Sequence, residues 1–177
     1  MERVQLKYHA LQKLAGATDM SVILLTDVAQ RRLISVICDE TTVQQFNARI
    51  NNEMSRILLP EALLQVADAK LEMLVVGLYD GQYQVMLSNT KTGASTRVRM
   101  SDAVLLSAIS DTPLYIEARL MEKQSMPFDA KSVQVAIPIN SMDKKSLQAA
   151  LEHAVEEENY ELASHIRDEI NSREKNE

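Results

Sequence analysis

The chain of 177 residues has no tryptophan and only two phenylalanines, so aromatic residues make up just 4% of it. With so few rings, a core has to be built from aliphatic side chains and from nine methionines, whose flexible thioethers fill irregular gaps. Only four glycines and four prolines are present, which excludes a collagen-like or low-complexity chain. Because 46% of the residues are hydrophobic, we expect one folded body with room for a small appendage.

Cysteine and long apolar runs are also scarce. The single Cys38 cannot form an intramolecular disulfide, which is typical of a reducing cytoplasm. It ends an aliphatic run with no obvious base beside it, so a small buried hydrophobe is favoured over a nucleophile. No apolar run approaches the roughly 20 residues of a membrane helix, and the N-terminus lacks the apolar segment of a signal peptide. We therefore predict a cytoplasmic protein with no membrane partner.

An excess of basic charge is absent too. The formal charge is −6, and residues 143–177 alone contribute −5 of it, with 10 acidic against 5 basic side chains. Nucleic-acid binders usually carry a basic surface, because contacts with phosphates release counterions. Direct DNA binding by this acidic tail is therefore disfavoured, although the fold could still gather Arg31, Arg32, Arg49 and Arg56 into a local basic patch.

Alternating apolar residues and turn signals predict strands over most of the first 120 residues. Strands are expected at 4–10, 21–27 and 31–39, followed by helices at 41–58 and 60–70. Asp80-Gly81 predicts a tight hairpin turn between strands 71–79 and 82–89, and a third strand follows at 94–100. Ser101 is expected to cap a helix at 101–110, before a strand at 113–117 and a short helix at 117–123. The fold class predicted is α+β, with a mainly antiparallel sheet and packed helices.

The last 35 residues predict a separate antiparallel α-helical hairpin. Leu147, Leu151, Ala154 and Val155 form one apolar stripe, and Tyr160, Ala163, Ile166 and Ile170 form the other. Asn159 is the expected N-cap between them. Two helices this short need a body or a partner to be stable. We divide the chain into a body at 1–126, a connector at 127–142 with an edge strand in VQVAI (133–137), and the hairpin at 143–177.

The hairpin sequence VEEENYELASHIRDEI (155–170) resembles the UVR motif of bacterial Uvr excision-repair subunits. The resemblance rests on Leu151, Ala154, Val155, Glu158, Tyr160, Glu161, Ala163, Arg167, Asp168 and Ile170. It implies a protein-docking role, with another UVR-containing or adaptor-type protein as partner. The partner-binding residues it implies are Leu151, Tyr160, Ala163, Ile166, Arg167 and Asp168. A dimer is the oligomeric state we expect.

The body resembles the bifunctional nuclease family of small α+β proteins, which are credited with DNase and RNase activity. Arg99, Ser101, Asp102 and Ala103 in RMSDAVLLSAIS match the family's pattern directly, and PLYI matches the strand that follows. The family's expected Gly-Glu-x-Glu pattern corresponds to Cys38, Asp39 and Thr41 here. This resemblance implies metal-assisted hydrolysis of DNA or RNA phosphodiesters.

Such hydrolysis needs groups that activate water and stabilise charge on the phosphate, and carboxylate-bound Mg²⁺ or Mn²⁺ does both. The candidate catalytic residues are Asp39, Glu40 and Asp102, with Asp39 and Asp102 as metal ligands. Arg99 and Ser101 are the candidate substrate-binding residues.

The same side chains also have structural interpretations. Asp39-Glu40 and Ser101-Asp102 are typical helix caps, and Arg99 is typical of a surface ion pair. Several family positions are replaced, including Met100 for a proline and Glu61 near an expected histidine. A catalytically degenerate scaffold or regulator that acts through the hairpin is therefore the alternative function, and a purely dimerising hairpin is the third.

Overall fold

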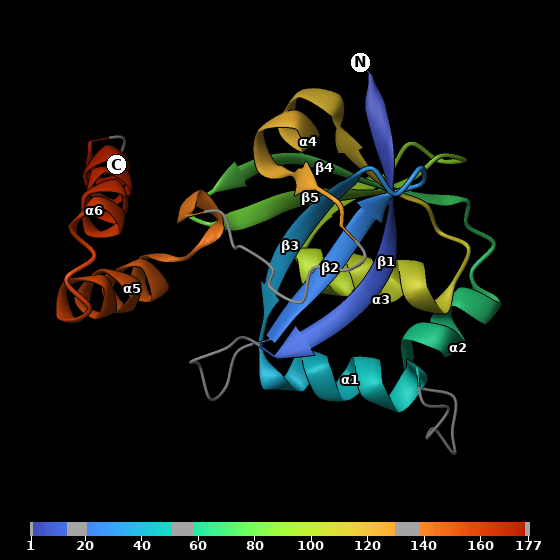
Figure 1. The fold of residues 1–177 in the computed structure, drawn as a ribbon. Coiled ribbons are helices and arrows are strands. Elements are labelled where there is room, and N and C mark those ends of the chain that lie inside the picture. The colour runs from blue at the N-terminus through green and yellow to red at the C-terminus, as the bar shows by residue number, and fades with distance from the viewer. Residues whose placement is uncertain (1, 14–20, 51–58, 130–138, 176–177) are drawn as a thin grey trace.

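The computed structural model describes residues 2–13, 21–50, 59–129 and 139–175, and within them the fold is α+β, as predicted (Figure 1). An eight-stranded, mostly antiparallel sheet carries packed helices and is followed by a C-terminal pair of helices. The strands are β1 (Arg3–Lys13), β2 (Ser21–Asp27), β3 (Arg32–Cys38), β4 (Leu71–Tyr79), β5 (Gln82–Asn89), β6 (Ser95–Val98), β7 (Leu114–Glu117) and β8 (Met126–Pro127). The helices are α1 (Glu40–Ile50), α2 (Leu59–Val66), α3 (Met100–Ile109), α4 (Ala118–Gln124), the 3-10 turn η1 (Ile139–Ser141), α5 (Lys144–Glu156) and α6 (Tyr160–Glu174).

The sheet consists of two antiparallel meanders joined by the short strand β7. The strand order is β6-β5-β4-β7-β1-β2-β3-β8. β7 pairs with β1 in antiparallel fashion and with β4 in parallel fashion, and the β4–β7 pair is the parallel one among the described strands. The Asp80-Gly81 turn between β4 and β5 is present, with positive φ angles of 46° and 71° as such a tight turn requires.

The main core lies on the face of the sheet that α1 and α3 cover. Phe46 of α1 and Val104 of α3 are almost completely buried there, and Tyr8 stacks on Phe46 with ring centroids 5.6 Å apart. Aliphatic residues of the strands fill the rest, as expected for a chain so poor in aromatic residues. A small second cluster covers the other face of β2 and β3, where Met126 and Phe128 pack against Val22, Leu24 and Leu33.

Several element boundaries differ from the predictions. α2 ends at Val66 instead of Lys70. Lys70 directly precedes β4, and its carbonyl accepts hydrogen bonds from Thr90, which follows β5. α1 ends at Ile50, and residues 51–58 of the predicted helix lie outside the described residues. The edge strand of the connector forms at 126–127, paired with β3, whereas the predicted VQVAI segment also lies outside the described residues.

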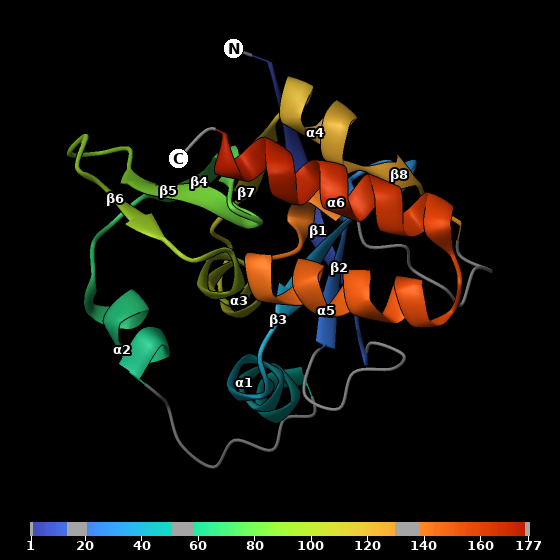
Figure 2. The same ribbon diagram turned by 90° about the vertical axis from the view of Figure 1, so that its left-hand side faces the viewer.

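The C-terminal helices form a hairpin with its own apolar core. α5 and α6 run side by side in opposite directions (Figure 2). Their core contains Leu147, Ala154, Ala163 and Ile166, which are all buried. Both helices begin at side-chain caps: Asp143 accepts a hydrogen bond from the Ser146 amide, and Asn159 accepts one from the Leu162 amide. The N-cap predicted at Asn159 is confirmed.

Candidate functional site

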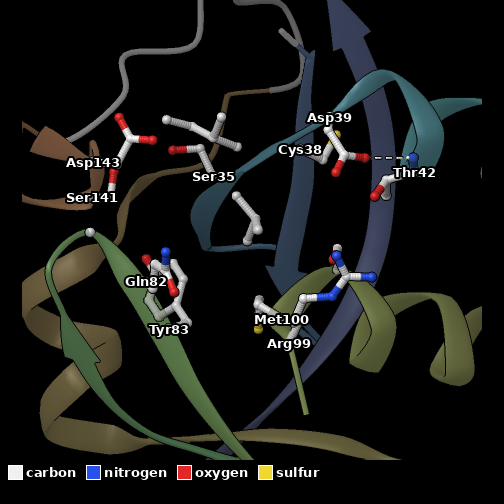
Figure 3. A pocket seen from close by; sticks show the side chains of 14 residues that line it. Ser35, Cys38, Asp39, Thr42, Gln82, Tyr83, Arg99, Met100, Ser141 and Asp143 are labelled. Atoms are coloured by element: carbon white, nitrogen blue, oxygen red, sulfur yellow. Dashed lines mark hydrogen bonds between the residues drawn. The ribbon is translucent and has the colours of Figure 1, made fainter. Parts of the chain in front are cut away.

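A cavity of about 390 Å³ lies where the body meets the base of the hairpin. Its lining comes from the end of β3, the β4–β5 turn, the segment before α3 and the segment before α5 (Figure 3). These segments are distant in sequence and are brought together by the twisted sheet and by α3. The polar side chains around it include Ser35, Asp39, Thr42, Gln82, Tyr83, Arg99, Ser101, Ser141 and Asp143. Three of the candidate site residues, Asp39, Arg99 and Ser101, therefore line one cavity.

Asp39 directly follows β3 and caps α1, as its structural interpretation predicted. Its Oδ1 accepts a hydrogen bond of 2.8 Å from the Thr42 amide. This backbone hydrogen bond, with smaller contributions from the Thr42 side chain and from Arg99, lowers the pKa of Asp39 below its usual value. The carboxylate is therefore ionised at neutral pH, and its Oδ1 already accepts a hydrogen bond from the first turn of α1.

Arg99 and Asp102 form a two-pronged ion pair at the rim. Arg99 Nε and Nη2 donate to the two carboxylate oxygens of Asp102 at 2.8 and 2.9 Å. The hydrogen bonds to Asp102 raise the pKa of Arg99 above its usual value. Asp102 itself does not line the cavity. The predicted surface ion pair is present, and it leaves Arg99 less able to bind a phosphate.

The cap predicted at Ser101 is wrong. α3 begins one residue earlier, at Met100, with Arg99 in extended conformation at the N-cap and no side-chain cap hydrogen bond. Met100 is 5% exposed, and its burial against the main core places the helix start there. Asp102 does lie in the first turn, where its charge suits the helix dipole.

Glu40 lies outside the cavity. It is the exposed first residue of α1, and its Oε1 accepts a long hydrogen bond of 3.4 Å from Gln44 Nε2. Within the described ranges, no group of three or more His, Cys, Asp or Glu side chains is placed to hold a metal ion. The proposed roles of Asp39, Glu40 and Asp102 in metal binding and catalysis stay predictions.

Cys38 behaves as the sequence predicted. Its side chain is buried, and Sγ donates a hydrogen bond of 3.4 Å to the carbonyl of Ser21. Burial, with smaller contributions from Asp39 and Glu40, raises the pKa of the Cys38 thiol to about 11. A thiol held in this protonated form is a poor nucleophile.

Ser35 and Tyr83 are among the cavity residues that the sequence analysis did not assign to a site. They are 1% and 6% exposed, and among the described residues their hydroxyl oxygens have no hydrogen-bond partner. Ser35 interrupts the aliphatic run LISVI of β3, and that polar residue inside a buried strand is the one signal that could have indicated it.

The predicted partner-binding residues fall into two groups. Tyr160, Arg167 and Asp168 are exposed, whereas Ala163 and Ile166 are buried in the hairpin core and Leu151 is half-buried against it. In this arrangement, Ala163 and Ile166 shape the hairpin without facing solvent. Val155 was predicted to belong to the apolar stripe of α5, but it is exposed and lies outside the hairpin core. The sequence analysis gave no partner-binding role to Val155 or Leu162, and both are exposed beside the α5–α6 turn, as is Tyr160.

Arg173 fastens α6 to the body. Its Nη1 donates to Asp80 Oδ1 in the β4–β5 turn at 3.0 Å and to the Met142 carbonyl at 2.8 Å. Its Nη2 donates to the Asn140 carbonyl at 3.1 Å, and its Nε donates to Glu169 at 2.8 Å. One guanidinium thus connects α6, the segment before α5 and the body.

Comparison with known proteins identifies the hairpin. Residues 144–175 match the family model of the UvrB/uvrC (UVR) motif, which confirms the resemblance noted for this segment. No curated protein matches the chain. Among the described helices, none is long and apolar enough to span a membrane.

Proposed function

We propose that this protein acts by docking onto another protein through its UVR hairpin. The observation that carries the proposal is the exposure of three large apolar side chains close to the α5–α6 turn, Val155, Tyr160 and Leu162, here called the hairpin tip. These side chains are 51%, 67% and 39% exposed. An exposed apolar group that includes an aromatic ring is typical of the centre of a protein interface.

Charge around the hairpin tip indicates the chemistry of the partner. Four exposed glutamates, Glu156, Glu157, Glu158 and Glu161, adjoin these apolar residues in the sequence. Complementary potentials speed association and exclude wrong partners. We therefore expect an apolar partner surface bordered by Lys and Arg, such as another UVR-type hairpin or an adaptor-type protein with that charge.

A second copy of this chain is the other candidate partner. A symmetric contact between two hairpin tips would place the same glutamates against each other, so electrostatics favours a different protein. The dimer expected from the sequence stays a prediction. Light scattering of the full chain measures its mass directly, and a dimer whose mass depends on the hairpin tip would identify the second copy as the partner.

The test compares the wild-type chain with the double variant Tyr160→Ala, Leu162→Ala in affinity capture, followed by titration of the purified captured protein. We expect the variant to bind at least about tenfold more weakly, because aromatic anchors carry much of an interface's binding energy. We also expect binding to weaken with salt.

The matched control is Leu63→Ala on α2, which removes an exposed leucine away from the hairpin. Equal affinity of the wild type and the tip variant for the captured protein would contradict the docking proposal. A loss of affinity in the Leu63 variant as large as in the tip variant would contradict it too.

Metal-assisted hydrolysis of DNA or RNA is the second candidate function. It is favoured by the placement of Asp39, Arg99 and Ser101 around one cavity. Docking is supported better, because Asp39 caps α1 and Arg99 is paired with Asp102.

The test is a nuclease assay of highly purified protein with Mg²⁺ or Mn²⁺, comparing the wild type with Asp39→Asn and Asp102→Ala. If the protein hydrolyses DNA or RNA, both variants should lose nuclease activity at least about a hundredfold. The control variant Asp111→Ala should keep the activity of the wild type.

A further inference from the structure

α2 exposes its apolar side chains on the side of the body away from the hairpin (Figure 1). None of its residues is buried, and Leu59, Leu63 and Val66 are 70%, 54% and 80% exposed. Their spacing of four and three residues places these three side chains on one face of the helix. Helices this short are unstable by themselves, and most helical stability in proteins comes from packing of an apolar face. The exposed face of α2 therefore indicates a surface that another molecule covers.

A cavity of about 330 Å³ adjoins this face of α2. Its apolar lining consists of Pro60 from α2, Val98 from β6, and Ala103, Leu105, Leu106 and Ile109 from α3. Residues three apart are neighbours on a helix, so Leu63 lies next to Pro60 at the border of the cavity. The three exposed side chains of α2 and this cavity are here called the α2 patch. It combines a protruding apolar side chain with an apolar hollow beside it.

We propose that the α2 patch binds a second copy of this chain, with Leu63 of each copy entering the cavity of the other. In a dimer with two-fold symmetry, the same patch lies on both sides of the contact. Such a patch has to supply both the protruding group and the hollow that receives it. The α2 patch supplies both, which favours a second copy as its occupant.

The charges at the α2 patch permit contact between two identical surfaces. Glu61, the charged residue of α2, is paired with Arg49 at 2.7 Å, and these side chains are 17% and 8% exposed. Asp102, the charged residue of the cavity lining, is paired with Arg99 at 2.8 Å. Two chains with a net charge of −6 repel each other, and they meet at the lowest electrostatic cost where charges are already paired. The hairpin tip, with its four exposed glutamates, offers no such place.

Other occupants fit the α2 patch less well. A helix that lies on a lipid surface typically carries Lys or Arg on its polar face, and α2 has neither. A different protein that is guided by charge finds little on this patch to recognise. The dimer therefore uses a surface separate from the hairpin tip and leaves the tip free for the docking proposed above.

The contact has to extend beyond α2. Stable interfaces bury about 800 Å² on each partner, which is more than three side chains supply. α3 and β6 continue the patch through the cavity lining, and β6 ends the sheet among the described strands. An edge strand is prone to pair with other chains, and a partner that covers β6 would prevent this. We therefore expect hydrogen exchange in α2 and β6 to slow as the chain dimerises.

The experiment measures the mass of the full chain by sedimentation equilibrium over a range of concentrations. We expect the wild type to form a dimer. Leu63→Glu should weaken the dimer at least about a hundredfold, because it would bury a carboxylate in an apolar cavity of each partner. Leu63→Ala should weaken it about tenfold, through loss of apolar contact alone. Because Leu63 is exposed, both variants should keep the fold, and circular dichroism of the monomer checks this.

Val28→Glu is the matched control. Val28 is 62% exposed and lies in the β2–β3 turn, at the opposite end of the strand order from β6. This variant should dimerise like the wild type. The hairpin-tip variant should also dimerise like the wild type, and the Leu63 variants should keep the wild-type affinity for the docking partner per chain. These two measurements separate failure of the dimer from failure of the docking function.

A wild-type chain that stays a monomer up to about 0.1 mM would overturn the proposal. A dimer that Leu63→Glu does not weaken would also overturn it, as would an equally large effect of Val28→Glu. A dimer that only the hairpin-tip variant disrupts would place the contact at the tip instead. Binding of a monomeric chain to phosphatidylcholine vesicles that Leu63→Glu abolishes would identify a lipid surface as the occupant.

Discussion

Cys38 has a buried thiol whose pKa, about 11, lies well above the ordinary value of 9.0. At pH 8 the thiolate fraction is therefore about a hundredfold lower than in an unfolded chain. We expect alkylation by iodoacetamide at pH 8 to be at least about a hundredfold slower in the folded protein than in denaturant. Equal rates in the two states would show that the thiol is not protected.

The same shift makes stability depend on alkaline pH. The folded protein holds the thiol proton more tightly than the unfolded chain does. The thiol therefore contributes to the free energy of unfolding in full below pH 9, and this contribution is lost as the pH rises through about 11. Cys38→Ala should lose less stability than the wild type between pH 9 and 11 in denaturant titrations. Identical pH profiles would contradict the expected linkage.

Gly81 is a second residue with a specific physical role. Its φ is 71°, and a Cβ at this position would overlap the backbone of Met142 just before α5. Gly81→Ala should therefore combine about 1 kcal/mol of backbone strain with displacement of the hairpin base. We expect faster hydrogen exchange in α5 and α6 in this variant.

Gly93→Ala is the matched control for Gly81→Ala. Gly93 also has a positive φ, 75°, but a Cβ there meets nothing within 4 Å. The Gly93→Ala variant should lose stability from backbone strain alone, and hydrogen exchange in α5 and α6 should be as slow as in the wild type. If Gly93→Ala speeds exchange in the hairpin as much as Gly81→Ala does, the close approach to Met142 is not the cause.

At this scale, the sequence predicts residues whose role is local. Asp39 and Asn159 act as caps, Asp80-Gly81 makes the turn, and Cys38 is buried, because neighbouring residues decide all four outcomes. The partnerless hydroxyl of Tyr83 could not be predicted, because it depends on which strands meet across the cavity.

At the scale of elements, Arg173 joins α6 to the body through Asp80 and through the carbonyls of Met142 and Asn140. Its side chain is 16% exposed and that of Asp80 is 48% exposed, so water screens this ion pair, whereas the bonds to the two carbonyls are partly buried. We expect Arg173→Ala to weaken attachment of the hairpin by about 2–3 kcal/mol, measured by hydrogen exchange of α6. Arg173→Lys should weaken attachment less than Arg173→Ala does but still measurably, because lysine keeps the positive charge and loses the planar guanidinium that donates several hydrogen bonds.

Arg167→Ala is the matched control for Arg173, because Arg167 lies on the same helix and is exposed. It should leave hydrogen exchange of α6 unchanged. As a predicted partner-binding residue, Arg167 should instead affect docking. An equal effect of both variants on exchange would show that the helix, and not the bonds of Arg173, determines attachment.

Hairpins and helices were predictable at this scale because their signals are local. The strands at 71–79 and 82–89 form as predicted, and the helix pair at the C-terminus is confirmed. The position of α6 against the β4–β5 turn was not predictable. It depends on Arg173 reaching Asp80 across 93 positions of sequence, and an arginine in the last turn of a helix is also typical of a surface residue.

For the whole molecule, the strand order is what local signals leave undetermined. The two meanders follow from short turns, but β7 places them side by side by pairing Leu114–Ile116 with both β1 and β4. A four-residue strand has no sequence signal for its neighbours, because pairing depends on long-range packing. The cavity beside the hairpin is a consequence of this order, so its composition could be predicted only in part.

The division into two cores leads to a prediction about cooperativity. The main core spans the sheet, α1, α3 and α4, whereas the hairpin core contains four buried side chains from α5 and α6. Regions with few buried apolar contacts open at lower free energy than the main core. Native-state hydrogen exchange should therefore show α5 and α6 opening as one unit, several kcal/mol below β1, β2 and β4. Equal opening free energies in both regions would mean that the hairpin and the body unfold as a single cooperative unit.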